Sequence, residues 1–205
     1  MVLMWARMWA YRAAHQITEN REFLIGLDRA IGDADHGENL DRGFRAVVDY
    51  LDGNEESHAD AILRGVGFTL ISNVGGASGP LYGSAFIRMA DVAADDLTPA
   101  VVASMLDRGV AAIQARGHAQ AGEKTMVDVW LPVADAVNDA VDQGADMAVI
   151  CDVLAETATA AAQATAPMIA TKGRASYLGE RTIGHVDPGA ASSSLILQAL
   201  LDCVE

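Results

Sequence analysis

Three aspartates lie close together in the segment DRAIGDADHGEN, and their spacing suits a metal ion. Asp28, Asp33 and Asp35 fall within eight residues, and intervening glycines let the chain bend around them. Carboxylates held this close repel one another unless a cation lies between them. Hard divalent cations prefer oxygen ligands of this kind. The segment therefore predicts a magnesium or manganese site that is shared with a phosphate.

The same acidic segment allows other interpretations. It could be an exposed turn in which Asp33 or Asp35 only caps the next helix. An EF-hand loop is excluded, because a start at Asp33 places glycine at the third side-chain ligand and no glutamate at the twelfth position. His36 could be a catalytic base, a metal ligand or a hydrogen-bonding wall of the site, and we favour the wall. The side-chain amide of Asn39 could form a hydrogen bond with a ligand or with the start of the next helix.

Two glycine-rich segments lie between expected helices. In GGASGPLYGSAF, residues 75–86, small residues expose backbone N–H groups that could bind a phosphate, or they allow two helices to cross closely. GHAQAGEKT, residues 117–125, is similar to a P-loop, but Glu123 adds one residue before the lysine and no strand precedes it, so we reject that interpretation. Lys124 and Thr125 remain candidates for lining the site, and Thr125 for capping a helix.

The last irregular segment concentrates positive charge. Lys172, Arg174 and Arg181 fall within ten residues of a chain that has only 14 basic side chains. They could reach phosphate oxygens, or they could pair with surface acids. Asp187 followed by Pro188 predicts a capped helix N-terminus beside them.

The overall charge limits the possible partners. The formal net charge is −14, which disfavours binding to nucleic acid and to anionic membranes, and a phosphate site here needs bound cations. Two cysteines, Cys151 and Cys203, exclude a disulfide framework and favour a cytoplasmic location. The apolar N-terminus predicts an amphipathic first helix rather than a signal peptide. The sequence has no uninterrupted apolar run of about 18 residues, so it predicts no membrane span.

The elements that must position these residues are helices. Only 5% of the residues are aromatic, and alanine, valine and leucine dominate the apolar half, which favours close-packed helices. We expect helices over residues 1 to about 25, 40–51, 59–72, about 81–94, 99–116, 126–141, about 147–166 and 190–204. The chain, residues 1–205, is therefore predicted to be one all-α domain, an up-and-down bundle or barrel of about eight helices that gathers alternate loops at one end.

Four motifs in order, IGDADHG, GGASGPLYG, GEKTMVD and KGRASYLGER-IGH-DPG, resemble the L subunit of dihydroxyacetone kinase over nearly the whole chain. The resemblance implies an eight-helix barrel that holds ADP or ATP at one end, with two Mg²⁺ between three aspartates and the phosphates. Matched motif by motif, the metal ligands are Asp28, Asp33 and Asp35, and Arg174 is catalytic. The implied nucleotide contacts are His36, Gly37, Glu38, Asn39, Ala77, Ser78, Gly117, Met126, Arg174, Asp187, Pro188 and Gly189. Glu38 departs from the small or apolar residue usual there, so its contact is expected through the backbone.

The resemblance also implies partners. Dihydroxyacetone is held on a separate K subunit, and in one variant of the family ADP stays bound and is rephosphorylated by the M subunit of the phosphotransferase system. The stand-alone chain and the histidine and asparagine of GDADHGEN favour this variant. The alternatives are an ATP-exchanging L subunit and a nucleotide-state sensor that contacts a transcription regulator. A helical carrier with lipid in its interior ranks last, because it does not explain the acidic segment.

Overall fold

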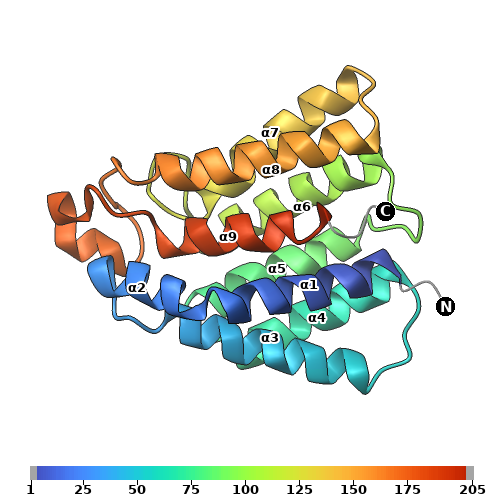
Figure 1. Ribbon diagram of the computed structural model, residues 1–205, viewed down its shortest axis with the longest axis horizontal. Helices are drawn as coiled ribbons and strands as arrows, with labels where there is room; N and C mark the ends of the chain where they lie inside the picture. Colours follow the sequence, from blue (N-terminus) through green and yellow to red (C-terminus); the bar gives the residue numbers. More distant parts are fainter. Residues whose placement is uncertain (1–3, 202–205) are drawn as a thin grey trace.

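The computed structural model describes residues 4–201, and in that range it contains helices and no strand (Figure 1). The α-helices are α1 Trp5–Glu19, α2 Arg21–Ile31, α3 His36–Asp52, α4 Ala59–Asn73, α5 Ser78–Ala90, α6 Pro99–Gly117, α7 Val127–Asp142, α8 Met147–Ala164 and α9 Pro188–Gln198. A 3₁₀ helix, η1, covers Arg174–Thr182 between α8 and α9. The predicted all-α class is confirmed.

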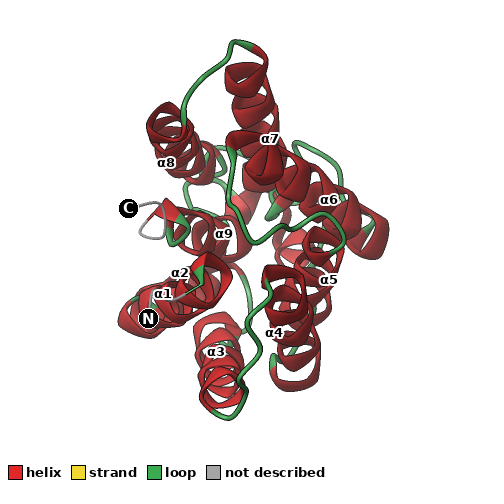
Figure 2. Ribbon diagram, turned by 90° about the vertical axis from the view of Figure 1, so that its right-hand side faces the viewer, coloured by secondary structure: helices red, strands yellow, loops and turns green. Residues whose placement is uncertain are grey.

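Eight helices form a closed ring. Starting at α1 and continuing through α3, α4, α5, α6, α7, α8 and α9, each helix packs against the next, and α9 returns to α1 (Figure 2). α2 continues the line of α1 toward one end, where it packs against α3, α9 and η1. This arrangement confirms an up-and-down barrel of about eight helices, and it brings η1 and the α2–α3 connection to the same end of the barrel (Figure 1).

The core is formed by helical stripes of apolar residues. On α1, Trp5, Trp9, Ala13 and Ile17 recur every four residues, so they share one face, and all four are buried. Trp9 contacts Phe86 of α5 with ring centroids 5.0 Å apart. The predicted amphipathic first helix is therefore confirmed.

Several helix boundaries were predicted correctly because they depend on local caps. Thr98 accepts a hydrogen bond from the Val101 amide at the start of α6, and Asp187 accepts one from the Ala190 amide at the start of α9. Met126 rather than Thr125 occupies the N-cap position of α7, but Thr125 Oγ1 accepts a hydrogen bond from the Val127 amide at 3.2 Å, as a capping hydroxyl does. The expected end of the last helix, residue 204, and Cys203 lie outside the described residues.

Other boundaries differ from the expectation. The first predicted helix is two, α1 and α2, which are separated at Asn20. The acidic segment is mostly helical, because α2 extends to Ile31 and α3 already begins at His36, so only residues 32–35 connect them. α5 begins at Ser78 rather than near Leu81, since a proline in the first turn of a helix lacks only an N–H that would be unpaired there.

α8 is the one helix among the described residues that is long and apolar enough, by length and composition alone, to cross a membrane. A single helix of this kind is weak evidence for a span. In the structure α8 packs against α7 and α9, and its buried residues Ile150, Leu154, Ala158 and Ala162 recur every four positions along one face.

Candidate functional site

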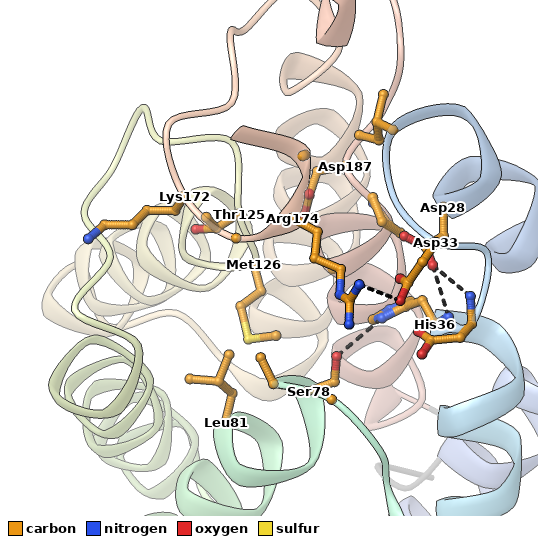
Figure 3. Close-up of a pocket in the computed structure, with 18 of the residues that line it drawn as sticks. Asp28, Asp33, His36, Ser78, Leu81, Thr125, Met126, Lys172, Arg174 and Asp187 are labelled. Atoms are coloured by element: carbon orange, nitrogen blue, oxygen red, sulfur yellow. Dashed lines mark hydrogen bonds and ion pairs between the residues drawn. The ribbon is translucent and has the colours of Figure 1, made fainter. Parts of the chain in front are cut away.

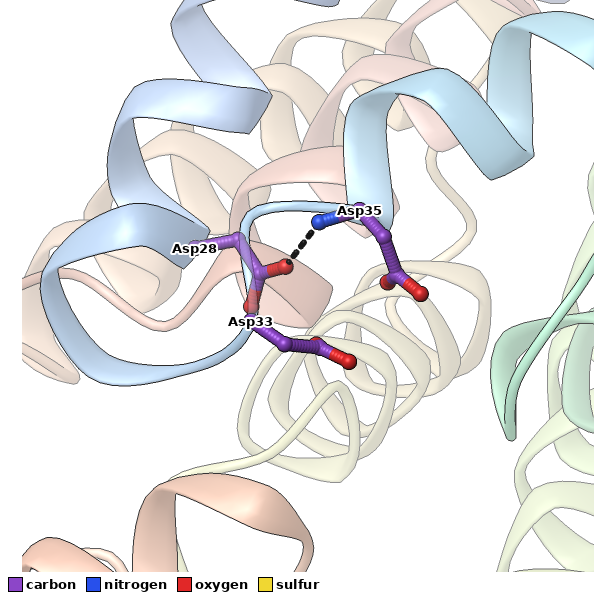
Figure 4. A group of neighbouring side chains, drawn as sticks. All are labelled: Asp28, Asp33 and Asp35. Carbon is purple, nitrogen blue, oxygen red and sulfur yellow. Dashed lines mark hydrogen bonds between the residues drawn. The ribbon is translucent and has the colours of Figure 1, made fainter.

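The three aspartates of the acidic segment converge. Asp28 stands in the last turn of α2, and Asp33 and Asp35 lie in the connection to α3 (Figure 4). One carboxylate oxygen from each residue lies within 4.8 Å of the other two. Asp28 is buried, whereas Asp33 and Asp35 are exposed. This oxygen-only set, open on one side, fits a hard divalent cation that keeps positions for water or phosphate.

The local backbone holds these carboxylates in place. Asp28 Oδ2 accepts hydrogen bonds from the amides of Asp35, at 2.8 Å, and His36, at 3.1 Å. Gly32 is required here, because an added Cβ would overlap Asp28 Oδ1. Ala34 adopts a left-handed backbone with φ +63°, a conformation that costs about 1 kcal/mol for a residue with a Cβ. The connection is thus bent around the carboxylates and fastened to one of them.

Arg174 approaches the aspartates from the other side of the site. Its Nη1 lies 2.9 Å from Asp33 Oδ2, and its side chain is largely exposed (Figure 3). The ion pair links η1 to the α2–α3 connection, 141 residues earlier in the sequence. Arg174 is therefore within reach of any anion that the aspartates hold through a cation.

A cavity of about 210 Å³ opens beside the aspartates, at the end of the barrel where several helices begin. The N-termini of α3, α5, α7 and α9 all contribute to its wall, which places four positive dipole ends around one space. Among the predicted site residues, its lining includes Asp28, Asp33, Asp35, His36, Asn39, Ala77, Ser78, Met126, Arg174, Asp187, Pro188 and Gly189. Such a wall is suited to an anion.

A second cavity of about 330 Å³ adjoins the first and shares Ala77, Leu81 and Met126 with it. Its lining is mostly apolar and includes Pro80 and Ile113. Gly117, a predicted site residue, lines this second cavity rather than the first. The combined space has an end rich in carboxylates and amides and an end suited to an apolar ring.

Residues 30–202 match the family described as the DAK2 domain. The chain belongs to the DAK2-domain family. The match covers most of the chain and includes Asp33, Asp35 and every later residue of the site. The resemblance that was drawn from the four motifs is therefore confirmed.

Two similar proteins support this family membership. The chain is 45% identical over 194 residues to the "PEP-dependent dihydroxyacetone kinase, ADP-binding subunit DhaL" of Escherichia coli (strain K12), with 94% of this chain and 92% of that protein covered. It is 42% identical over 196 residues to the "PTS-dependent dihydroxyacetone kinase, ADP-binding subunit DhaL" of Lactococcus lactis subsp. lactis (strain IL1403), with 96% and 95% covered. These relatives are subunits of a kinase.

A solved structure has the same fold. The dihydroxyacetone kinase of C. freundii in complex with AMP-PNP and Mg²⁺ superimposes with a TM-score of 0.72 at 21% sequence identity over 96% of this chain. The chain spans about a third of that longer kinase, 33% of its length. At this identity the likeness supports the helical barrel of the DAK2 family and no finer detail.

Two of the predicted nucleotide contacts in this DAK2-family chain lie outside both cavity linings. Gly37 is buried where α3 packs on α2, and an added Cβ would overlap the Arg21 carbonyl oxygen. Glu38 is exposed, and its carboxylate lies 3.9 Å from Arg21. The glycine is explained by this close packing between helices, and the placement gives no support to a nucleotide contact for either residue.

His36 has hydrogen-bond partners on both ring nitrogens. Its Nδ1 lies 3.2 Å from Ser78 Oγ and its Nε2 lies 2.9 Å from Ser192 Oγ. Ser192 is bonded in turn to the hydroxyl of Tyr82, at 2.6 Å, which ties the imidazole to the barrel core. Burial lowers the pKa of His36, against the opposing charges of Asp28 and Asp35. A neutral, fixed ring suits the predicted wall of the site.

Some residues that line the first cavity lie outside the predicted set. Ile31, Leu81 and Ala175 also line the first cavity, and nothing in their residue type indicates this. Lys172 was noted for its charge and lines both cavities, but its side chain extends away from Asp33 (Figure 3). Position within a helix N-terminal turn was the one signal that could have identified Leu81.

Proposed function

We propose that this chain is the nucleotide-carrying L subunit of a PEP-dependent dihydroxyacetone kinase, working in the cytoplasm. It holds ADP or ATP through two Mg²⁺ and supplies the phosphoryl group to dihydroxyacetone bound on a K subunit. The resulting ADP remains bound and is rephosphorylated by the M subunit of the phosphotransferase system. The names of the two DhaL relatives, each matched over nearly its full length, support this proposal.

The convergence of three carboxylates on a cavity walled by four helix N-termini carries the proposal. A protein with a net charge of −14 repels nucleotides unless cations are provided locally. The Asp28, Asp33 and Asp35 carboxylates would hold Mg²⁺, which supplies the positive charge that neutralises phosphate oxygens. The amides at the start of α5 would donate to the same oxygens.

In this proposal the two cavities bind different parts of the nucleotide. The carboxylate-rich cavity takes the phosphates, and the adjoining apolar cavity, with Leu81, Ile113 and Gly117 in its wall, takes the adenine ring. Arg174 donates hydrogen bonds to the transferring phosphoryl group as charge builds on its oxygens. Its ion pair with Asp33 keeps the guanidinium at the cavity mouth until then.

A partner must bring the acceptor hydroxyl to this mouth. Three large apolar side chains are exposed on elements at this end of the barrel, Phe23 on α2, Tyr177 on η1 and Ile183 just after η1. Tyr177 is 87% exposed, which is unusual for an aromatic side chain. Because α2 and η1 pack against each other, these side chains suit a docking surface for the K subunit.

The first test is to measure what the purified protein carries. Native mass spectrometry after purification in Mg²⁺ should give a mass increased by ADP and magnesium, and EDTA should remove both. A protein that emerges free of nucleotide and gains none from Mg-ADP would contradict the proposal.

A second test separates the variants of the activity. With purified K and M subunits, phosphoenolpyruvate and the general phosphotransferase proteins should drive phosphorylation of dihydroxyacetone, and free ATP alone should not. Turnover with ATP in the absence of the M subunit would instead support the ATP-exchanging type. Retained ADP without turnover from either donor would favour a nucleotide-state sensor that contacts a transcription regulator.

A further inference from the structure

Lys124 is a charged residue in an unusual position. It is one of two lysines in the chain, and its side chain is 1% exposed. Its backbone has φ +59°, a left-handed conformation that costs about 1 kcal/mol for a residue with a Cβ. Glycine would adopt this backbone without strain. The presence of lysine here instead indicates that its side chain has a role.

The ammonium group of Lys124 is surrounded by backbone carbonyls. Its Nζ donates to the carbonyl oxygens of Thr165, at 2.7 Å, His185, at 2.6 Å, Met168, at 3.1 Å, and Ala166, at 3.2 Å. Three N–H donors are shared among four acceptors, and each acceptor belongs to a segment outside the regular helices. Burial lowers the pKa of Lys124, and the nearby Asp187 carboxylate raises it.

These carbonyls belong to two connections, the one after α8 and the one before α9, and Lys124 itself belongs to a third, before α7. Other hydrogen bonds join the same three segments. The Thr171 amide donates to Glu123 O, the Gly184 amide to Ala166 O, and the Asp187 amide to Thr165 Oγ1. Lys124 is the charged centre of this set. As predicted, Lys124 and Thr125 belong to the lining of the first cavity, but the ammonium of Lys124 is bonded to these carbonyls.

Each connection leads directly into cavity-lining residues. Met126 follows Lys124 by two positions, Asp187 follows His185 by two, and Arg174 follows Met168 by six. We propose that Lys124 is a positioning residue: its ammonium holds the three connections together and so sets the placement of the nucleotide-binding wall. The inference rests on the proposed function for the identity of the ligand, Mg-ADP.

A purely structural role is the competing explanation, and the chain offers a matched control for it. Arg7 also donates to three backbone carbonyls, those of Leu51, at 2.6 Å, Asn54, at 2.8 Å, and Glu56, at 2.8 Å. None of these four residues lines either cavity. Lys124→Met and Arg7→Met each remove a cation from a cluster of carbonyls, and only the first of these clusters is at the site.

The test compares Mg-ADP affinity in both variants under conditions where urea unfolding shows each to be fully folded. Lys124→Met should weaken Mg-ADP binding at least tenfold, and Arg7→Met should leave it within twofold of the wild type even if both lose stability. A Lys124→Met affinity within twofold of the wild type, or an equal loss in Arg7→Met, would overturn the proposal.

Hydrogen–deuterium exchange of the nucleotide-free proteins gives a readout that is independent of ligand binding. Lys124→Met should accelerate exchange at the amides of Thr171, Gly184 and Asp187, whereas Arg7→Met should not. Unchanged exchange at all three amides overturns the proposal. If the wild type binds no Mg-ADP, the proposed function fails, and this measurement alone decides the role of Lys124.

A milder variant covers the case in which Lys124→Met does not fold. Thr165→Val keeps the shape of a fully buried side chain and removes the acceptor of the Asp187 amide. It should weaken Mg-ADP binding at least threefold and accelerate exchange at Asp187. Affinity equal to that of the wild type would contradict the proposal.

Discussion

Replacement of Asp33 by asparagine should change the stability of the protein in opposite directions without and with Mg-ADP. Without cations, the Asp33 carboxylate is repelled by those of Asp28 and Asp35, whose nearest ligand oxygens lie within 4.8 Å. Two unit charges at that separation repel by about 0.9 kcal/mol in water, so the two neighbours together cost about 1.7 kcal/mol. Asparagine removes this repulsion with almost no change of shape.

The loss of one attraction reduces this gain. Asp33 also pairs with Arg174 at 2.9 Å, but the arginine side chain is 72% exposed. Exposed pairs of this kind contribute about 0.5 kcal/mol. Asp33→Asn should therefore stabilise the cation-free protein by about 1 kcal/mol, which raises the melting temperature of a chain this long by about 2–4 °C.

Mg-ADP should reverse the sign of the stability difference between Asp33→Asn and the wild type. A ligand present at about 1,000 times its Kd stabilises the folded state by about 4 kcal/mol, and a variant that cannot hold the cation forgoes most of this. The wild type should then be the more stable protein by roughly 3 kcal/mol, the ligand term less the gain in the cation-free state. A reversal of this kind distinguishes a metal ligand from a residue that only supports the fold.

The assay is urea unfolding followed by circular dichroism, in EDTA and in saturating Mg-ADP. Asp91→Asn is the matched control, because Asp91 pairs with Arg64, at 3.3 Å, and Arg88, at 2.9 Å, and is about as exposed as Asp33. The control should lose a little stability equally in both conditions. Destabilisation of Asp33→Asn in EDTA, or stabilisation of it by Mg-ADP to the same extent as the wild type, would refute a role for Asp33 as a metal ligand.

Three further predictions concern other parts of the site. Burial raises the pKa of Asp187 from 3.8 to about 7, so the folded state retains a proton that the unfolded state releases, and stability falls as pH rises between these values. Asp187→Asn should abolish this slope, at most about 1.4 kcal/mol per pH unit, as measured by urea unfolding without ligand at several pH values. Tyr82→Phe leaves the polar partners Ser192 and Ser193 short of a buried hydrogen bond and should cost about 1–3 kcal/mol in the same unfolding assay. Arg174→Ala should reduce phosphoryl transfer in the reconstituted kinase at least about 100-fold while Mg-ADP affinity stays within about tenfold, and equal losses in both would argue against a role in the transition state.

What could be predicted from the sequence is what depends on near neighbours. The Thr98 and Asp187 caps involve amides three residues away, and both are present as expected. The acidic trio is contained in eight residues, so its convergence follows from a single bend at residues 32–35. Local sequence also identified the glycine-rich starts of helices, although α5 begins three residues before the expected position.

The rest depends on contacts between residues far apart in the chain. The partners of Lys124 lie 41 to 61 residues away, so no local pattern reveals that this lysine is buried in a group of carbonyls. Gly37 resembles a nucleotide contact by its motif, but it packs against Arg21 of α2.

The charges at the cavity explain why an acidic barrel can serve a nucleotide. Alternate helices of an up-and-down ring point the same way, so α3, α5, α7 and α9 all direct their N-termini to this end. Each N-terminus carries about half a positive charge, so the four together contribute about +2, and Arg174 adds one more. The three aspartates nevertheless concentrate negative charge at one end of the cavity, where they would repel a diphosphate unless cations lay between them. Two Mg²⁺ would add four positive charges there, which exceed the three negative charges of the aspartates and would attract a diphosphate. We therefore expect nucleotide and cations to bind as one unit, each weakly in the absence of the other.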